Sequence, residues 1–368
     1  MTKSIPELVN TGIHKLRAYE PGKSIDELER ELGISPIVKM ASNENPLGPS
    51  QKVKAAIQSH LDNLCVYPDA DCYHLKTLLS EKLQVNNRQL VIGNGSNEVL
   101  ELIAKVFLQE SDEVIFSEHA FAMYSIFSEA MGATLVAVKD RNWCHDLDAM
   151  ADAITEKTKI IFIANPNNPT GTWVSKGELK AFLKSVPEHV IVVLDEAYFE
   201  YVDQENYQSG LHYIDRFPNL VVTRTFSKVY GLANIRVGYA VASETIAGYM
   251  NRVRQPFNVS GISEVAAIAA LGDQEYLLKS LETNALGMAQ LQMGIGALNL
   301  DYIPSVANFL TIRVGDLAQD IYQALLRKGY IVRPLSGYGM TSYLRISVGT
   351  EAQNQGFLVA LKEVLDSL

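Results

Sequence analysis

The chain has 368 residues, and 42 acidic against 32 basic side chains give it a formal net charge of −10 at neutral pH. Hydrophobic residues make up 47% of the sequence and charged residues 20%, an ordinary globular composition that excludes a disordered or collagen-like chain. The acidic balance argues against a nucleic-acid-binding protein and against a protein that binds anionic membranes.

The first 45 residues have weak periodicity, and we expect them to form an arm or a part of a smaller domain. From about residue 89, short β-branched runs that indicate buried strands alternate with amphipathic stretches. These runs are residues 89–92, 113–116, 134–138, 159–164, 190–194, 220–223 and 239–241. Residues 98–108 and 176–186 have helical periodicity, and Ser175 and Glu178 form a capping-box start for the second helix. The alternation predicts an α/β domain around a mainly parallel sheet flanked by helices.

The pattern changes after residue 260. Residues 261–298 indicate helices rich in alanine and leucine. Strand-like runs at 308–314, 330–334 and 343–348 then alternate with helices at 317–328 and 351–366. We therefore predict an N-terminal arm over residues 1–45, a large α/β domain over 46–284 and a smaller α+β domain over 285–368.

Four loops follow predicted strands at their carboxyl ends, where open α/β sheets bind their ligands. The first, Gly93–Asn97, runs from a strand into a helix, and glycines before a helix N-terminus suit a phosphate. Its spacing matches neither a Walker loop nor the GxGxxG fingerprint, so a tight turn explains this loop equally well.

The second and third loops carry polar side chains in contrasting settings. Asn165–Gly171 holds two prolines and three asparagines; they suit a rigid turn, and an enzyme could use that rigidity to aim the amide of Asn168 at a ligand oxygen. In the third loop, Asp195 directly follows the apolar run 190–194. A carboxylate there is costly to desolvate unless a cation or strong donors meet it, so its position favours a functional role over a structural one.

In the fourth loop, Lys228 follows two hydroxyl residues, Thr225 and Ser227, and precedes Arg236 by eight residues. Hydroxyls and a guanidinium suit a phosphate, and a lysine partly desolvated among cations can act as a Schiff-base nucleophile. Together the four loops offer a phosphate cradle, an amine for an aldehyde, a carboxylate for a ring nitrogen and donors for an oxygen. That combination predicts pyridoxal 5′-phosphate as the cofactor.

With these residues identified, the sequence resembles the fold-type-I aminotransferases of the class I/II group over nearly its whole length. Within that group it is most similar to the histidinol-phosphate aminotransferase subgroup. The motifs that carry the resemblance are SNENPLGPS, VYPDA, GNGSNE, ANPNNPTG, LDEAYFEY, RTFSKVYGLANIRVGY and LRISVGT.

The resemblance implies roles around the cofactor for matching positions. Lys228 would form the imine and then move the proton between the substrate Cα and the cofactor. Asp195 would pair with the pyridinium nitrogen, while Tyr198 and Asn168 would hydrogen-bond the phenolic oxygen. The residues implied to hold the cofactor phosphate are Ser96, Asn97, Thr225, Ser227 and Arg236, with Tyr67 reaching over from a second subunit of a homodimer.

Other aromatic and basic positions would complete the site. Phe121 falls where the family stacks an aromatic ring on the cofactor, although on its own it fits a core residue better. The family pattern places the substrate at Tyr19, Arg333 and Arg345, with Tyr124 close by. Without the resemblance, Tyr67 fits an ordinary turn, Tyr124 a core position and Arg345 an exposed strand cation.

One position departs from the family pattern. Asn234 stands where the family usually has glycine, and we expect it to take the turn there because asparagine tolerates left-handed backbone. The spacing from Lys228 to Arg236 is kept, so only the local loop geometry is in question.

The resemblance implies transamination between L-histidinol phosphate and 2-oxoglutarate, giving imidazole-acetol phosphate and L-glutamate. An aromatic amino-acid aminotransferase and a phosphothreonine decarboxylase would share the residues around Lys228. A cofactor-sensing part of a transcription regulator would need a DNA-binding domain, for which residues 1–45 leave no room.

The cellular setting follows from simple features. Cys65, Cys72 and Cys144 are too few and too irregularly spaced for a disulfide framework or a zinc site, and we expect no metal. The longest apolar runs fall far short of a membrane span, and the first residues lack the apolar stretch of a secretory signal. We therefore expect a soluble, cytoplasmic protein with small-molecule substrates.

Overall fold

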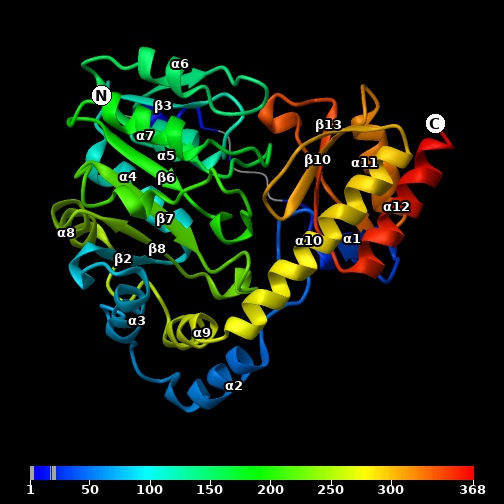
Figure 1. Ribbon diagram of the computed structural model, residues 1–368, viewed down its shortest axis with the longest axis horizontal. Helices are drawn as coiled ribbons and strands as arrows, with labels where there is room; N and C mark the ends of the chain where they lie inside the picture. The colour runs from blue at the N-terminus through cyan, green and yellow to red at the C-terminus, as the bar shows by residue number, and fades with distance from the viewer. Residues whose placement is uncertain (1–3, 17, 19–21) are drawn as a thin grey trace.

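The computed structural model describes residues 4–16, 18 and 22–368. A seven-stranded sheet, in the order β2-β8-β7-β6-β5-β3-β4, forms the centre of its larger part (Figure 1). The strands are β2 (Leu90–Gly93), β3 (Glu113–Ser117), β4 (Thr134–Val138), β5 (Thr158–Ala164), β6 (Ile191–Asp195), β7 (Leu220–Thr225) and β8 (Gly238–Ala242). Within this sheet β8 is antiparallel to β2 and β7, and the other pairs are parallel. The prediction of a mainly parallel sheet is confirmed, and each strand lies within two residues of its predicted bounds.

Helices cover both faces of this sheet, because its buried strands present apolar side chains alternately to either side. In β5, Ile161 and Ile163 belong to one core and Ile160 and Phe162 to the other. The first core packs against α2 (Gln51–His60), α3 (Tyr73–Leu83), α6 (Leu147–Asp152), α7 (Lys176–Ser185) and α9 (Gly261–Leu271). The second packs against α4 (Gly95–Phe107), α5 (Met123–Ala130) and α8 (Glu244–Val253). Burying each large apolar side chain contributes about 1.5–3 kcal/mol.

The C-terminal part is built on an antiparallel sheet in the order β12-β13-β10-β9. Its elements are α10 (Gln274–Ala297), β9 (Asp301–Ile303), β10 (Phe309–Arg313), α11 (Ala318–Arg327), β12 (Arg333–Pro334), β13 (Tyr343–Ser347) and α12 (Glu351–Leu365). The predicted run 330–334 divides, because β11 (Tyr330–Ile331) pairs with β1 (Val38–Lys39) in a separate parallel sheet. In Figure 1, α10 crosses from the large sheet to the C-terminal part, so the predicted boundary at 284/285 lies inside one helix.

The N-terminal segment lies against the C-terminal part. Besides β1 it contains a helix that the sequence analysis missed, α1 (Ile25–Leu32), which packs Leu28 against Leu326 and Ile331. Ser24 and Glu27 form its capping box, and Gly33 ends it with a φ of 65°. The domain division at 45/46 and 284/285 stays a prediction.

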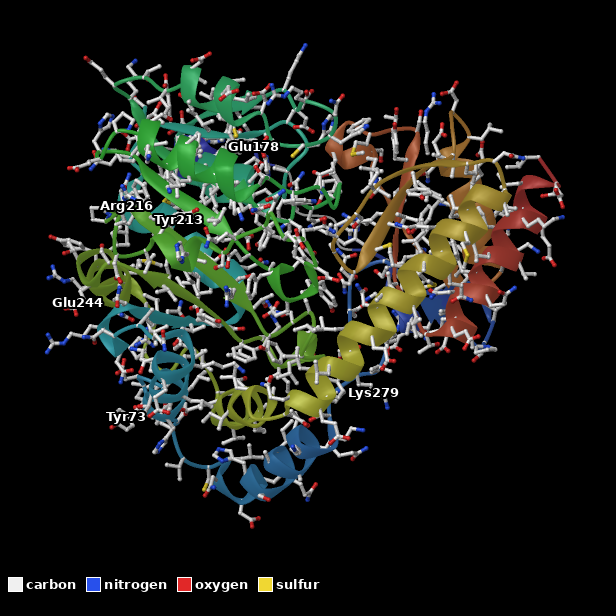
Figure 2. All side chains as sticks on the ribbon, in the orientation of Figure 1. Tyr73, Glu178, Tyr213, Arg216, Glu244 and Lys279 are labelled. Atoms are coloured by element: carbon white, nitrogen blue, oxygen red, sulfur yellow. The ribbon has the colours of Figure 1, made fainter. Side chains whose placement is uncertain are left out.

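Charged side chains such as Glu178, Arg216 and Glu244 extend from the outer surface of the large part (Figure 2). Among the described residues, no helix combines the length and the apolar character needed to span a bilayer.

Short 3-10 helices connect the main elements: η1 (Ile5–Leu8), η2 (Thr11–Ile13), η3 (Leu61–Asn63), η4 (Asn87–Gln89), η5 (Phe199–Tyr201), η6 (Gly210–Tyr213), η7 (Ala233–Ile235) and η8 (Ser336–Tyr338).

Candidate active site

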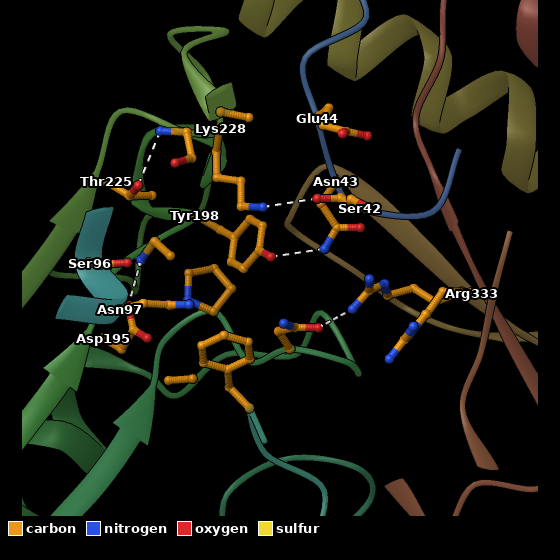
Figure 3. A pocket seen from close by; sticks show the side chains of 18 of the residues that line it. Ser42, Asn43, Glu44, Ser96, Asn97, Asp195, Tyr198, Thr225, Lys228 and Arg333 are labelled. Carbon is orange, nitrogen blue, oxygen red and sulfur yellow. Dashed lines mark hydrogen bonds between the residues drawn. The ribbon is translucent and has the colours of Figure 1, made fainter. Parts of the chain in front are cut away.

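A cavity of about 270 Å³ opens at the carboxyl edge of the parallel strands, between the large sheet and the C-terminal sheet (Figure 3). All four predicted loops reach it, because parallel strands end at the same edge of a sheet. The predicted residues that line it are Ser96, Asn97, Phe121, Tyr124, Asn168, Asp195, Tyr198, Thr225, Ser227, Lys228, Arg236, Arg333 and Arg345. Tyr19 lies outside the described residues, and Tyr67 lies away from this cavity.

Lys228 extends into the cavity from the loop after β7. Its Nζ donates a hydrogen bond to the carbonyl oxygen of Ser42 at 3.0 Å. Burial lowers the pKa of Lys228 to about 8, and the positive charges of Arg345 and Arg236 act in the same direction. At a pKa of about 8, about a tenth of the Lys228 amine is neutral at pH 7, far more than for an ordinary lysine, and the neutral amine is the form that acts as a nucleophile or a proton acceptor.

Asp195, the last residue of β6, is only 5% exposed. It accepts hydrogen bonds from Tyr124 Oη at 2.8 Å, from Thr223 Oγ1 at 3.1 Å and from the amide of Ala197 at 3.2 Å. Burial raises the pKa of the Asp195 carboxyl, while these three donors oppose that effect. A cationic group placed against this carboxylate would stabilise its ionised form and be stabilised in return.

The N-terminus of α4 and the guanidinium of Arg236 meet at one end of the cavity. A Cβ atom on Gly95 would clash with Arg236 Nη2, and one on Gly238 would clash with the backbone nitrogen of Ser96. Both glycines are therefore needed for this close approach. Arg236 Nη1 also donates to Ser227 Oγ at 3.2 Å. Free amides at a helix end beside an arginine make a site for an anion such as phosphate.

The loop around Asn234 differs from the expectation. Asn234 lies in η7, and the left-handed residues of this loop are Gly231, with a φ of 69°, and Arg236, with a φ of 55°. The prediction that Asn234 takes the left-handed turn is therefore wrong. The 3-10 helix accommodates asparagine without a special conformation, and the turn instead falls on the residue that points its guanidinium at α4.

Aromatic side chains form the floor of the cavity. Tyr124 is fully buried, its ring stacks on Phe162 at 4.7 Å between centroids, and its hydroxyl is engaged by Asp195. Phe121 meets the Tyr124 ring edge-on at 5.7 Å and lines the cavity. A planar ligand can therefore lie against the Phe121 side while the Tyr124–Asp195 bond holds the carboxylate in place.

Arg333 and Arg345 lie on one wall, contributed by the C-terminal sheet. They are directly opposite each other in the β12–β13 pair, so both side chains leave the same face of the sheet. Arg345 is 6% exposed; it donates to the carbonyl oxygen of Ala41 at 2.8 Å and to Asn168 Oδ1. Its Nε is buried and has no hydrogen-bond partner in the described part of the chain. Like charges directly opposite each other are destabilising, and an anion between them would offset this repulsion.

The structure adds lining residues that the sequence reasoning did not single out. Ser42, Asn43 and Glu44 enter the cavity from the N-terminal segment, and Tyr338 enters from η8. The first three belong to SNENPLGPS, one of the motifs that carry the family resemblance. The available signal was therefore the motif itself, since nothing local to it indicates contact with Lys228 or Tyr198.

A buried ion pair joins the end of β7 to the residue that follows β6. Arg224 Nη2 lies 2.8 Å from Glu196 Oε2, and the Glu196 side chain is fully buried. The guanidinium also lies 3.8 Å from the centre of the Phe199 ring. Removing one partner would leave the other charge buried and alone, so the pair fixes the two strand ends relative to each other.

Tyr67 is 79% exposed and stacks on Phe257 at 4.7 Å between ring centroids. Leu64 and Val66, with exposed fractions of 63% and 68%, lie in the same surface groove. Tyr73, labelled in Figure 2, is another exposed aromatic residue at the start of α3. Leu64, Val66, Tyr67 and Phe257 therefore form a contiguous exposed apolar surface.

Comparisons with known proteins extend over nearly the whole chain. Residues 35–361 match the family model described as "Aminotransferase class I and II". The chain is 52% identical over 358 residues to histidinol-phosphate aminotransferase 1 of Idiomarina loihiensis, and the alignment covers 97% of this chain and 98% of the relative. It is 52% identical over 360 residues to histidinol-phosphate aminotransferase 2 of Pseudomonas aeruginosa, with the same coverage. Among solved structures it resembles histidinol-phosphate aminotransferase of Sinorhizobium meliloti in complex with pyridoxal 5′-phosphate, with a TM-score of 0.89, 28% identity and 97% of both chains covered.

Proposed function

The chain belongs to the class I and II aminotransferase family, and we propose that it transfers an amino group between L-histidinol phosphate and 2-oxoglutarate. The products are imidazole-acetol phosphate and L-glutamate, and the cofactor is pyridoxal 5′-phosphate. The histidinol-phosphate aminotransferases that are 52% identical over 97% of the chain support this substrate and a place in histidine biosynthesis.

The observation that carries the substrate assignment is the pair of opposed arginines beside Lys228. Arg333 and Arg345 project from one sheet face into the cavity that also holds Lys228. A phosphate monoester carries close to two negative charges near neutral pH, whereas a carboxylate carries one. Two arginines on one wall therefore suit histidinol phosphate better than an aromatic amino acid.

The residues of the cavity fit the cofactor at each of its polar groups. Its phosphate suits the α4 N-terminus with Ser96, Asn97, Thr225, Ser227 and Arg236, its ring nitrogen suits Asp195, and its phenolic oxygen suits Tyr198 and Asn168. When bound, the cofactor supplies an aldehyde for an amine and a ring that accepts electrons from the substrate Cα.

The protein's own contribution is to place charges and protons. Asp195 holds a proton on the ring nitrogen, because its buried carboxylate is most stable beside a cation. Lys228, whose lowered pKa leaves a share of neutral amine, first binds the cofactor and then moves a proton at the substrate Cα. Phe121 covers the ring, and Arg333 and Arg345 hold the substrate phosphate in a fixed position.

The exposed apolar surface supports a homodimer with shared active sites. Leu64, Val66, Tyr67 and Phe257 would be covered by a second copy, and Tyr67 would reach the cofactor phosphate of the partner. We place the protein in the cytoplasm, because its three unpaired cysteines suit a reducing compartment.

Half-reaction spectroscopy tests the function. The cofactor-loaded protein is mixed with histidinol phosphate, phenylalanine, glutamate or phosphothreonine separately, and the visible absorption of the cofactor is followed. We expect rapid bleaching with histidinol phosphate and glutamate and none in Lys228→Ala. Equal or faster bleaching with phenylalanine would favour an aromatic aminotransferase, and release of carbon dioxide from phosphothreonine would indicate a decarboxylase.

A further inference from the structure

Three consecutive residues of the N-terminal segment each contact one functional side chain. The carbonyl oxygen of Ala41 accepts from Arg345 at 2.8 Å, and that of Ser42 accepts from Lys228 at 3.0 Å. Asn43 uses its side chain instead, and its Nδ2 donates to Tyr198 Oη at 2.8 Å (Figure 3). The segment therefore touches the substrate arginine, the lysine and the phenol in sequence.

Asn43 is buried and hydrogen-bonded through both its main chain and its side chain. It is 1% exposed, its amide nitrogen donates to Ser347 Oγ at 2.8 Å, and its carbonyl oxygen accepts from Asn308 Nδ2 at 2.9 Å. Its Oδ1 accepts from Ser347 Oγ at 3.2 Å. Both ends of its side-chain amide and both of its main-chain groups are thus engaged.

This network fixes which end of the side-chain amide faces Tyr198. The Ser347 hydroxyl accepts a hydrogen bond from the backbone nitrogen of Asn43. The one proton of that hydroxyl is donated to the side-chain oxygen of Asn43, Oδ1. The NH₂ group of Asn43 consequently faces Tyr198, whose oxygen accepts. The proton of Tyr198 is left free to point elsewhere.

We propose that Asn43 is a positioning residue that turns the Tyr198 hydroxyl, so that its proton points into the cavity and is donated to the phenolic oxygen of the cofactor. This inference rests on the proposed function. Asn43 itself does not touch the reacting atoms but acts through Tyr198, and Ser347 and Asn308 of the C-terminal part set its orientation.

Burial and the surrounding charges determine whether Tyr198 has a proton to donate. Burial raises the pKa of Tyr198, while Arg345 and the hydrogen bond from Asn43 oppose that effect, and Asp195 adds to it. Lys228 Nζ also lies 5.6 Å from the centre of the Tyr198 ring. Tyr198 is therefore a protonated donor, and the direction of its proton decides whether an anionic oxygen in the cavity is stabilised.

The test is the pH titration of the visible absorption of the cofactor-loaded protein, with Asn43→Gly as the main variant. Asn43 has a φ of 56°, and glycine keeps that left-handed backbone while it removes the amide. A hydrogen bond to the anionic phenolic oxygen lowers the midpoint of this titration, so we expect the variant to raise the midpoint by about half to one pH unit. Asn43→Asp should raise it further, because a carboxylate only accepts and would draw the Tyr198 proton towards itself.

Tyr198→Phe and Asn45→Ala provide the controls. If Asn43 acts through Tyr198, adding Asn43→Gly to Tyr198→Phe should leave the midpoint where Tyr198→Phe alone places it. Asn45 is also buried and hydrogen-bonded, but to Val229 and Ser280, so Asn45→Ala should lower stability without moving the midpoint. Circular dichroism checks that each variant is folded.

The outcomes separate this inference from the proposed function. Additive shifts in the double variant, or an unchanged midpoint in both Asn43 variants, would overturn the role of Asn43 while the function stands. An equal shift in Asn45→Ala would overturn it too, because the effect would then be general loosening. A wild-type protein that gains no visible absorption with the cofactor would overturn the proposed function and this inference with it.

Discussion

Replacing Arg345 tests how the protein holds its substrate. Two nitrogens of the guanidinium donate hydrogen bonds to Ala41 and Asn168, and its buried Nε has no hydrogen-bond partner among the described residues. A phosphate beside it would receive at least one charge-assisted hydrogen bond, worth about 1.5–3 kcal/mol. At about 1.4 kcal/mol per decade, Arg345→Ala should raise the KM for histidinol phosphate about ten- to a hundredfold.

The same substitution also affects stability, and the two effects have to be separated. Without Arg345, the Ala41 carbonyl and Asn168 Oδ1 lose their donor, and each unsatisfied buried acceptor costs about 1–3 kcal/mol. Arg345→Lys keeps the positive charge but lacks the paired N–H donors of a guanidinium. It should therefore lose less stability than Arg345→Ala while still weakening the binding of the substrate. Urea unfolding measures the first effect and steady-state kinetics the second.

Arg313→Ala is the matched control, because Arg313 is an exposed residue of the same sheet that does not line the cavity. It removes an equal charge and should leave KM unchanged. Arg333→Ala should resemble Arg345→Ala, and in all these variants the cofactor should stay bound through Arg236. Unchanged KM in both Arg345→Ala and Arg333→Ala would place the substrate phosphate elsewhere. Equal losses with phenylalanine as donor would keep an anion site but favour an aromatic substrate.

Three further predictions concern the cofactor. Asp195→Asn should reduce kcat/KM about a hundredfold or more, because it removes an ion pair worth a few kcal/mol; a loss below about threefold would mean that the carboxylate is structural. Heterodimers formed from Tyr67→Phe and Lys228→Ala subunits should recover activity beyond either parent, since one site is then intact, and heterodimers without recovery would contradict the shared site. Cofactor-free protein should take up pyridoxal 5′-phosphate faster as pH rises, with a half-maximal rate near the lowered Lys228 pKa of about 8, because only the neutral amine attacks; a half-maximum near the ordinary lysine value of about 10.4 would contradict this assignment.

The strands of the large sheet were predictable because burial on both faces makes each one a continuous apolar run. The run 190–194 is an example, and its end also located Asp195, since a carboxylate at that point stands out in the sequence. Helix α1 was missed although Ile25, Leu28 and Leu32 follow helical spacing and Ser24 and Glu27 form its capping box, because it is only eight residues long and lies in a segment that is otherwise weakly periodic.

The role of Asn43 could not be predicted because it depends on contacts between distant parts of the chain. Ser347 lies 304 residues away in sequence and Asn308 lies 265 residues away, and no local pattern encodes either contact. The left-handed conformation of Arg236 was missed for a related reason. Propensity assigned it to Asn234, whereas the tertiary requirement to bring a guanidinium to α4 assigned it to an arginine.

The reversed direction of β8 constrains the length of the loop that carries Lys228. Thr225, the last residue of β7, pairs with Gly238, the first residue of β8, so the connection leaves and re-enters the sheet at the same point. A parallel strand would begin at the far edge of the sheet, about 20 Å away for a six-residue strand. Arg236 reaches the N-terminus of α4 because it lies two residues before Gly238, which pairs with Gly93 at the end of β2. Most surface loops tolerate insertions, but an insertion between Lys228 and Arg236 would move the arginine away from the helix. We therefore expect any change in the length of this segment to weaken the phosphate site.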